Sequence, residues 1–233
     1  MATPKLFARP TKAELAEMAM ARRKETAHHE AGHAVMFWLW WDDGNIHNIN
    51  MRPTTKRLGA VNSYSPISEV WIISTLREKS PVVAKNKAMS GIMKHMAGPA
   101  AGSWFNGTGS DWFDVEAEEY FSVQGIEFIN VENSDMARAV AAAKALHGDA
   151  GEISRQAYRF LRTVAKWTED AIFHPKAWPM VEALGARLET QQTMRASTAI
   201  QVMEQAAGDG WNHPVRLHAL GRTWKRRIVL PAF

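Results

Sequence analysis

The chain has 233 residues, of which 46% are hydrophobic and 22% are charged, and it contains ten tryptophans. This composition is typical of a globular protein with a sizeable core and excludes a disordered chain. The net charge is only +4 and cysteine is absent, so disulfides and cysteine–zinc sites are excluded, and any metal must be held by His, Asp or Glu.

The distribution of apolar residues predicts neither secretion nor insertion into a membrane. Residues 1–5 contain no apolar segment typical of a signal peptide. The longest strongly apolar run covers residues 34–41, far short of the ~20 residues that span a bilayer. Because the absence of cysteine also fits a reducing compartment, we expect a cytoplasmic protein with no membrane partner.

The first half of the chain is predicted to form helices and a small hairpin. Residues 11–24 have the pattern of one helix, and residues 25–41 have the pattern of a second. Rough strand patterns follow at 45–50 and 58–64, with a turn-like Pro-Thr-Thr-Lys segment between them. Residues 81–105 are mostly helical, with four apolar residues on one face: Ala84, Ala88, Ile92 and Met96.

The second half is predicted to be helical after an acidic interruption. Residues 106–132 look irregular and acidic, and no element boundary is evident in them. Gly148, Pro175 and Gly208 then punctuate four helical segments, at about 134–147, 151–173, 176–189 and 193–206. We therefore expect an α+β fold that is mostly α-helical, with a small β-sheet followed by a helical bundle.

Residues His29-Glu30-Ala31-Gly32-His33 form the pattern H-E-x-x-H. On a helix, histidines four positions apart lie one turn apart on the same face, so both imidazoles can reach one metal ion. Glu30 projects about 100° around the helix from His29, beside the ion rather than on it. Zinc lowers the pKa of a bound water to about 7, and a neighbouring carboxylate can accept the proton before the hydroxide attacks a carbonyl. The pattern predicts a zinc hydrolase; the alternative is an ordinary amphipathic core helix.

A catalytic zinc needs a third protein ligand and keeps a further position for water. Spacing alone does not choose this ligand. It leaves several glutamates and four named residues open: His95, Asp111, Asp114 and Asp135.

Residues 29–34 read H-E-A-G-H-A, the signature of the zinc peptidase domain of FtsH-type membrane proteases, which this chain resembles. Residues 46–53 and 58–61 take the places of that family's two strands. Residues 97–102 are similar to its A-G-R-x-A-E-E motif, and Ser134-Asp135-Met136, with alanines at 139 and 143, is similar to its S-N-D motif. The resemblance covers residues 25 to 205 in patches and implies a zincin-like metal helix.

In that family the aspartate of the S-N-D motif is the third zinc ligand, so the resemblance assigns this role to Asp135. A helix that begins near Ser134 would also favour a carboxylate in its first turn, which is the structural alternative for Asp135. Asp111 is the chief rival, because its separation from His33 is closer to the family's usual separation. The alanines that follow Asp135 favour Asp135.

Three residues depart from the family pattern. Pro99 stands in place of an arginine, and Gly102 in place of an acidic residue, and both changes alter the support around the site. His28 stands where the family often has an aromatic residue, and we expect it to be an exposed helix histidine.

The chain contains no phosphate-binding G-x-x-x-x-G-K-[ST] pattern. Gly102 and Gly107 have the required separation, but Thr108 follows where the pattern requires lysine. We therefore expect an ATP-independent zinc metalloendopeptidase that cleaves unfolded chains or one specific protein, with Glu30 as general base. A homo-oligomer is compatible with the resemblance. The expected organisation is an N-terminal helical segment (1–24), an FtsH-like peptidase domain (25–207) and a basic aromatic tail (208–233).

Two alternatives belong to other functional classes. Pro99 and Gly102 motivate a non-catalytic, zinc-stabilised interaction protein derived from a peptidase fold. The tail, with Trp211, Trp224 and several arginines, motivates nucleic-acid binding, but no recognised nucleic-acid motif supports this role and we rank it last.

Overall fold

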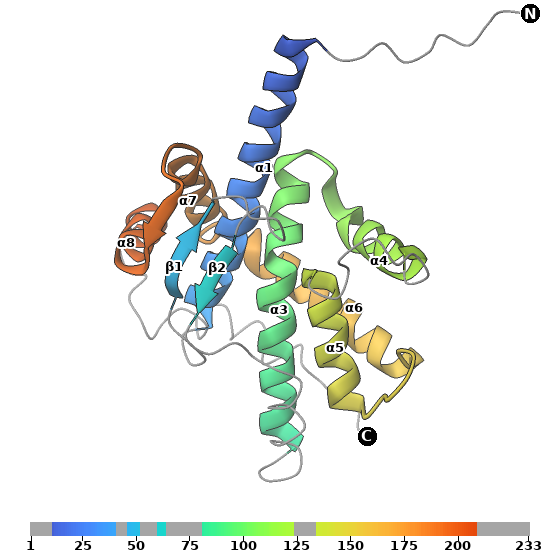
Figure 1. Ribbon diagram of the computed structural model, residues 1–233. Helices are drawn as coiled ribbons and strands as arrows, with labels where there is room; N and C mark the ends of the chain where they lie inside the picture. The colour runs from blue at the N-terminus through green and yellow to red at the C-terminus, as the bar shows by residue number, and fades with distance from the viewer. Residues whose placement is uncertain (1–10, 41–45, 52–59, 64–80, 124–133, 209–233) are drawn as a thin grey trace, which may run out of the picture.

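The computed structural model describes residues 11–40, 46–51, 60–63, 81–123 and 134–208, and this part is mostly helical with one small sheet, as predicted. The helices are α1 (Lys12–Leu39), α3 (Pro81–Phe105), α4 (Trp112–Val123), α5 (Asp135–His147), α6 (Arg155–Ile172), α7 (Trp178–Thr190) and α8 (Ala196–Ala207), with a short 3-10 helix, η2 (Gly109–Asp111), before α4. The strands are β1 (Ile46–Asn50), β2 (Ala60–Ser63) and β3 (Thr193–Arg195). Helix α3 occupies the middle of the molecule, where it contacts α1, α5 and α6 (Figure 1).

Helix α1 runs without a break, so the two helices predicted over residues 11–24 and 25–41 are one. No glycine or proline precedes Gly32 in this helix, and a boundary between two helices therefore has no local cause. Residues 16–25 are exposed, and this first half projects away from the other helices (Figure 1), whereas most residues from Ala27 onward are buried. Tertiary packing therefore holds only the second half, which carries the H-E-x-x-H motif.

Small residues determine how closely α1 and α3 approach each other. A side-chain carbon at Gly32 of α1 would collide with the carbonyl oxygen of Ala97 and lie 2.7 Å from the Cβ of Ala101, both on α3. Only glycine permits this approach, and the fully buried Ala31 and Ala34 line the same part of α1. The close crossing brings the backbone of α3 against the histidines of the motif.

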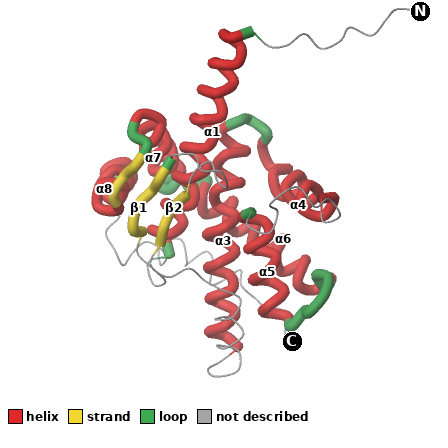
Figure 2. The backbone as a smooth tube through the Cα atoms, in the orientation of Figure 1, coloured by secondary structure: helices red, strands yellow, loops and turns green. Residues whose placement is uncertain are grey.

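The sheet has three strands in the order β2-β1-β3, and β1 pairs antiparallel with both neighbours. Ile49 of β1 lies opposite Val61 of β2 and Met194 of β3. The predicted β1–β2 pair is confirmed, whereas β3 was not predicted: residues 193–206 were expected to be helical throughout, but α8 begins only at Ala196. Figure 2 shows the sheet on one side of the helices, beside α8.

Residues 109–123 form η2 and α4, so the irregular structure predicted over 106–132 is wrong for this part. Helix α4 buries Trp112 and Phe113, and the ring centroid of Phe113 lies 6.2 Å from that of Tyr158 on α6. Acidic residues lie between the apolar ones and obscure the helical spacing in the sequence.

Several predictions fall outside the described residues. These are residues 1–10 of the predicted 1–24 segment, both ends of the strand predicted at 58–64, residues 124–132 of the predicted irregular segment, and the tail at 208–233 after its first residue. Within the described ranges, the helices are too short or too polar to cross a bilayer.

Candidate metal centre

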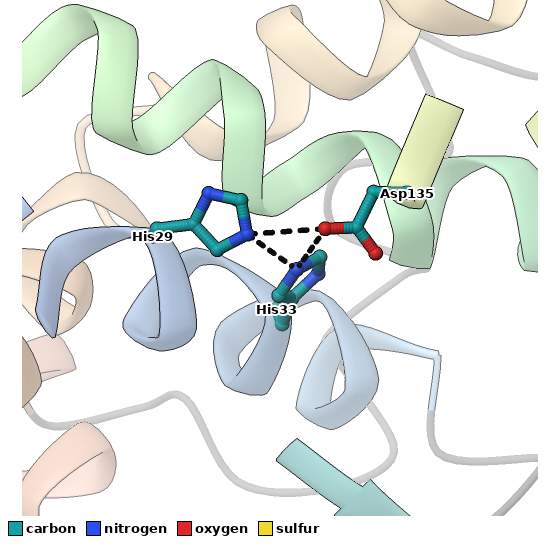
Figure 3. Close-up of side chains that lie close together, drawn as sticks. All are labelled: His29, His33 and Asp135. Carbon is teal, nitrogen blue, oxygen red and sulfur yellow. Dashed lines mark hydrogen bonds and ion pairs between the residues drawn. The ribbon is translucent and has the colours of Figure 1, made fainter. Parts of the chain in front are cut away.

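His29 and His33 lie one turn apart on the buried half of α1, as the motif requires. Their ring centroids are 4.7 Å apart and the rings are nearly perpendicular, at 80°. In this arrangement the two Nε2 atoms face each other at 3.1 Å. Figure 3 shows both side chains pointing from α1 toward the same place, to which Asp135 points from the start of α5.

The first turn of α5 holds Asp135 in position. Ser134 precedes the helix in an extended conformation, and its hydroxyl accepts a hydrogen bond of 3.1 Å from the backbone N–H of Ala137. A serine cap of this kind defines the residue at which the helix begins. Asp135 is therefore fixed as the first helical residue, and its carboxylate faces α1.

One oxygen of Asp135 meets both histidines. Its Oδ2 atom lies 3.1 Å from Nε2 of His29 and 3.0 Å from Nε2 of His33. Among the described residues, these three form the group of His, Asp and Glu donors close enough to share a metal ion. The arrangement can hold a divalent cation with two imidazole nitrogens and one carboxylate oxygen, a donor set that suits zinc.

The ring of His33 is oriented by the backbone of α3. Its Nδ1 lies 2.6 Å from the carbonyl oxygen of Lys94, and only a protonated Nδ1 can donate to that oxygen. In the neutral ring this leaves the lone pair on Nε2, the atom that faces His29 and Asp135. A metal-ligating histidine is commonly fixed in this way through its second nitrogen.

Burial and charge act in opposite directions on the pKa values of this cluster. Burial, the largest effect, disfavours the His33 cation, but the Asp135 carboxylate, with help from Glu30, raises the pKa of His33 to about 9. Burial likewise raises the pKa of Asp135, yet the His33 charge and hydrogen bonds from His29, His33 and His95 hold it well below its usual range. Without a metal the cluster thus pairs a carboxylate with an imidazolium, and a cation would replace the His33 proton.

Gly98 on α3 lies against the two histidines, and its lack of a side chain prevents a collision with them. A side-chain carbon at this residue would collide with Nε2 of His33 and lie 2.7 Å from Nε2 of His29. A zinc ion at about 2.1 Å from tetrahedral ligands separates them by about 3.4 Å, so the three donor atoms need only a small outward shift. The donor set therefore fits a zinc ion, and the missing side chain at Gly98 keeps both Nε2 atoms free of a steric clash.

Glu30 lies next to His29 on α1 and is 5% exposed. Its negative charge is close enough to His33 to contribute to the raised pKa of that ring. A buried carboxylate beside two histidines that could hold a metal ion is a group that could accept a proton there.

Two of the other residues considered for the third ligand lie away from the two histidines. Asp111 is exposed in η2, and Asp114 is exposed on α4, where its Oδ2 accepts a hydrogen bond of 3.1 Å from Arg162. His95 does lie at the site, with its Nδ1 3.5 Å from Oδ1 of Asp135. Burial lowers the pKa of His95. The structure therefore places Asp135, rather than Asp111 or Asp114, beside the two histidines.

The prediction that His28 is exposed is wrong. His28 is 5% exposed, its ring stacks on Phe105 at 3.8 Å, and its Nδ1 lies 2.9 Å from the carbonyl oxygen of Lys24. A side-chain carbon at Gly185 of α7 would lie 2.9 Å from the same ring. His28 therefore belongs to the packing between α1, α3 and α7.

Sequence reasoning did not identify two features of the site. The Lys94 carbonyl carries no signal in the sequence, because any residue could supply it. The Ala-Gly pair at residues 97 and 98 could have indicated the role of Gly98. The pair can be interpreted in this way only when it is known which face of α3 meets α1. A scan of the sequence against known protein families finds no match, and a search of curated proteins finds none either.

Proposed function

We propose that this protein is a zinc-dependent metalloendopeptidase of the FtsH type. His29, His33 and Asp135 hold the ion on a zincin-like helix, and Glu30 is the general base. One observation carries the proposal: two Nε2 atoms and one carboxylate oxygen lie 3.0 to 3.1 Å from one another, with Glu30 adjacent in the sequence. A pair of histidines on a structural helix needs neither the aspartate nor the glutamate, so the combination favours catalysis.

Zinc, when bound, supplies a Lewis acid and an acidified water in its open position. The remaining steps belong to side chains of this chain. The Glu30 carboxylate accepts the proton of the attacking water and can deliver it to the leaving amine. In the neutral ring of His33, the hydrogen bond to the Lys94 carbonyl keeps the proton on Nδ1 and leaves Nε2 for the ion, and the charge of Asp135 would offset part of the charge of the ion.

Peptide segments in an extended conformation are the proposed substrates. The side chains of His29 and Asp135 are 30% and 24% exposed, so the site is open to solvent on one side. A folded domain cannot bring its backbone to a partly buried site between helices, whereas an unfolded chain or one matching partner can. Peptide hydrolysis is favourable without coupling, so the proposed reaction does not use ATP.

The proposal is tested with Glu30→Gln, assayed on a labelled, unfolded casein without nucleotide. We expect zinc content to stay at one ion per chain and kcat to fall by about 10²- to 10⁴-fold, because the amide cannot accept a proton. Glu17→Gln is the matched control, since Glu17 lies on the exposed half of the same helix. Equal cleavage by wild type and Glu30→Gln would contradict the assigned mechanism.

A second candidate function is that of an interaction protein that zinc stabilises and that hydrolyses no substrate. One feature of the site favours this second function. Among the described residues no protein group accepts a hydrogen bond from Nδ1 of His29, whose ring is the more exposed of the two ligands. The first side-chain carbon of a residue at position 102 would lie 3.8 Å from this nitrogen. The FtsH-type family, which this chain resembles, has an acidic residue at this position. Zinc binding with no Glu30-dependent cleavage would support this second function.

A further inference from the structure

The two oxygens of the Asp135 carboxylate face different partners. Oδ2 lies between His29 and His33, whereas Oδ1 lies 3.5 Å from Nδ1 of His95. His95 is on α3, a helix that supplies no metal-binding side chain, and it lies outside the group of three donors. Its side chain is 20% exposed, so the neighbouring helices restrict its ring.

The position of His95 restricts how Asp135 can bind an ion. A carboxylate binds a cation through one oxygen or through both, and the second mode occupies two coordination positions. A proton on Nδ1 of His95 would engage Oδ1 and leave only Oδ2 for the ion. A catalytic zinc must retain a position for water, so an aspartate bound through one oxygen is the useful arrangement.

We propose that His95 is a positioning residue, which holds Oδ1 of Asp135 through its Nδ1–H so that Asp135 binds zinc through Oδ2 alone. This inference rests on the proposed function and deepens it. His95 acts through Asp135 and does not touch the ion. Groups that orient a metal ligand in this way typically change metal affinity by about 10- to 100-fold when they are removed.

The test measures zinc affinity by competition with a chromophoric chelator for wild type, His95→Ala and His95→Asn. The asparagine amide can place an N–H close to the position of Nδ1, whereas alanine cannot. His147→Ala is the control, because His147 lies at the opposite end of α5 from Asp135. The same proteins are then loaded with Co²⁺, whose visible absorption is stronger with four ligands than with five.

We expect His95→Ala to bind zinc about 10- to 100-fold more weakly than wild type. Its Co²⁺ absorption should weaken as Oδ1 joins the ion. We expect His95→Asn to recover most of the affinity and the spectrum, and His147→Ala to match wild type in both.

Two results would overturn the inference. The first is wild-type affinity and an unchanged Co²⁺ spectrum in His95→Ala. The second is equal loss in His95→Ala and His95→Asn, which would assign the effect to ring volume instead of the N–H. Both differ from the failure of the proposed function, in which either wild-type protein itself binds no zinc or cleavage does not depend on Glu30.

Discussion

Gly98 is the residue of α3 that lies against both histidines of the proposed metal centre. It faces the Nε2 atoms of His29 and His33, and even one added carbon would collide with both. Gly102 follows one turn later on the same side of α3, but a carbon there would lie 3.6 Å from the Cβ of His29, an ordinary contact distance. The two glycines therefore differ in how much they contribute to the site, although they look alike in the sequence.

This difference predicts opposite results for two identical substitutions. Gly98→Ala places a methyl group against both histidine rings, so we expect zinc binding to be lost. Gly102→Ala should bind zinc as wild type does. Elemental analysis of the purified variants measures the metal, and circular dichroism checks that both have folded. A full complement of zinc in Gly98→Ala would show that the ion does not lie between α1 and α3.

At the scale of residues, the sequence predicts the ligands better than their surroundings. His29, Glu30 and His33 follow from local spacing, because one helix fixes their relative positions. Asp135 required the resemblance, since more than 100 residues separate it from the motif. The burial of His28 could not be predicted, because α7 covers it only after the whole chain has folded.

At the scale of elements, α5 and α6 begin in the same way. Ser134 and Ser154 each precede a helix in an extended conformation, and each hydroxyl accepts a hydrogen bond of 3.1 Å from the N–H three residues later. Only the first of these caps lies beside a proposed ligand. The pair therefore separates the effect of a helix cap on stability from its effect on the site.

Replacing either serine by alanine should lower the free energy of unfolding by about 1 kcal/mol, because the N–H at the third helical residue loses its acceptor. Only Ser134→Ala should also weaken zinc binding, since its helix start fixes Asp135. Urea denaturation gives the stabilities, and chelator competition gives the affinities. Equal zinc affinities in the two variants would show that the cap does not position Asp135.

Elements were predicted well where local periodicity is strong. The helix expected over residues 81–105 has those bounds, and α5 begins within one residue of the expected start. Strand β3 was missed because its three residues precede a helix without a break and are defined only by pairing with β1. Helix α4 was missed because its acidic residues gave the impression of a loop.

At the scale of the whole molecule, the proposed ion would join distant parts of the chain. Asp135 is separated by 106 residues from His29 and by 102 from His33, so no short fragment contains the site. An ion that binds this arrangement binds the folded state and not the unfolded chain. Metal binding is then linked to global stability.

Zinc should therefore raise the melting temperature. At a free concentration of one hundred times Kd, the stabilisation is about 2.7 kcal/mol. This corresponds to a shift of about 5–10 °C for a chain of this size. Calorimetry with added zinc, and then with excess EDTA, measures the gain and its reversal. Asp135→Ala is the comparison, and a zinc-dependent shift of the same size in this variant would remove Asp135 from the site.

The projecting half of α1 has a consequence for local dynamics. A helical segment of this length is marginal in water when nothing packs against it, so its backbone hydrogen bonds should open without disturbing the core. Amide hydrogen exchange should be fast over residues 16–25 and slow from Ala27 onward, although the helix is continuous. The boundary between fast and slow exchange falls half a turn before His29. An ion bound to His29 should therefore extend the protection from exchange toward the N-terminus of α1. The length of α1 that is protected from hydrogen exchange would then show whether the metal centre is occupied.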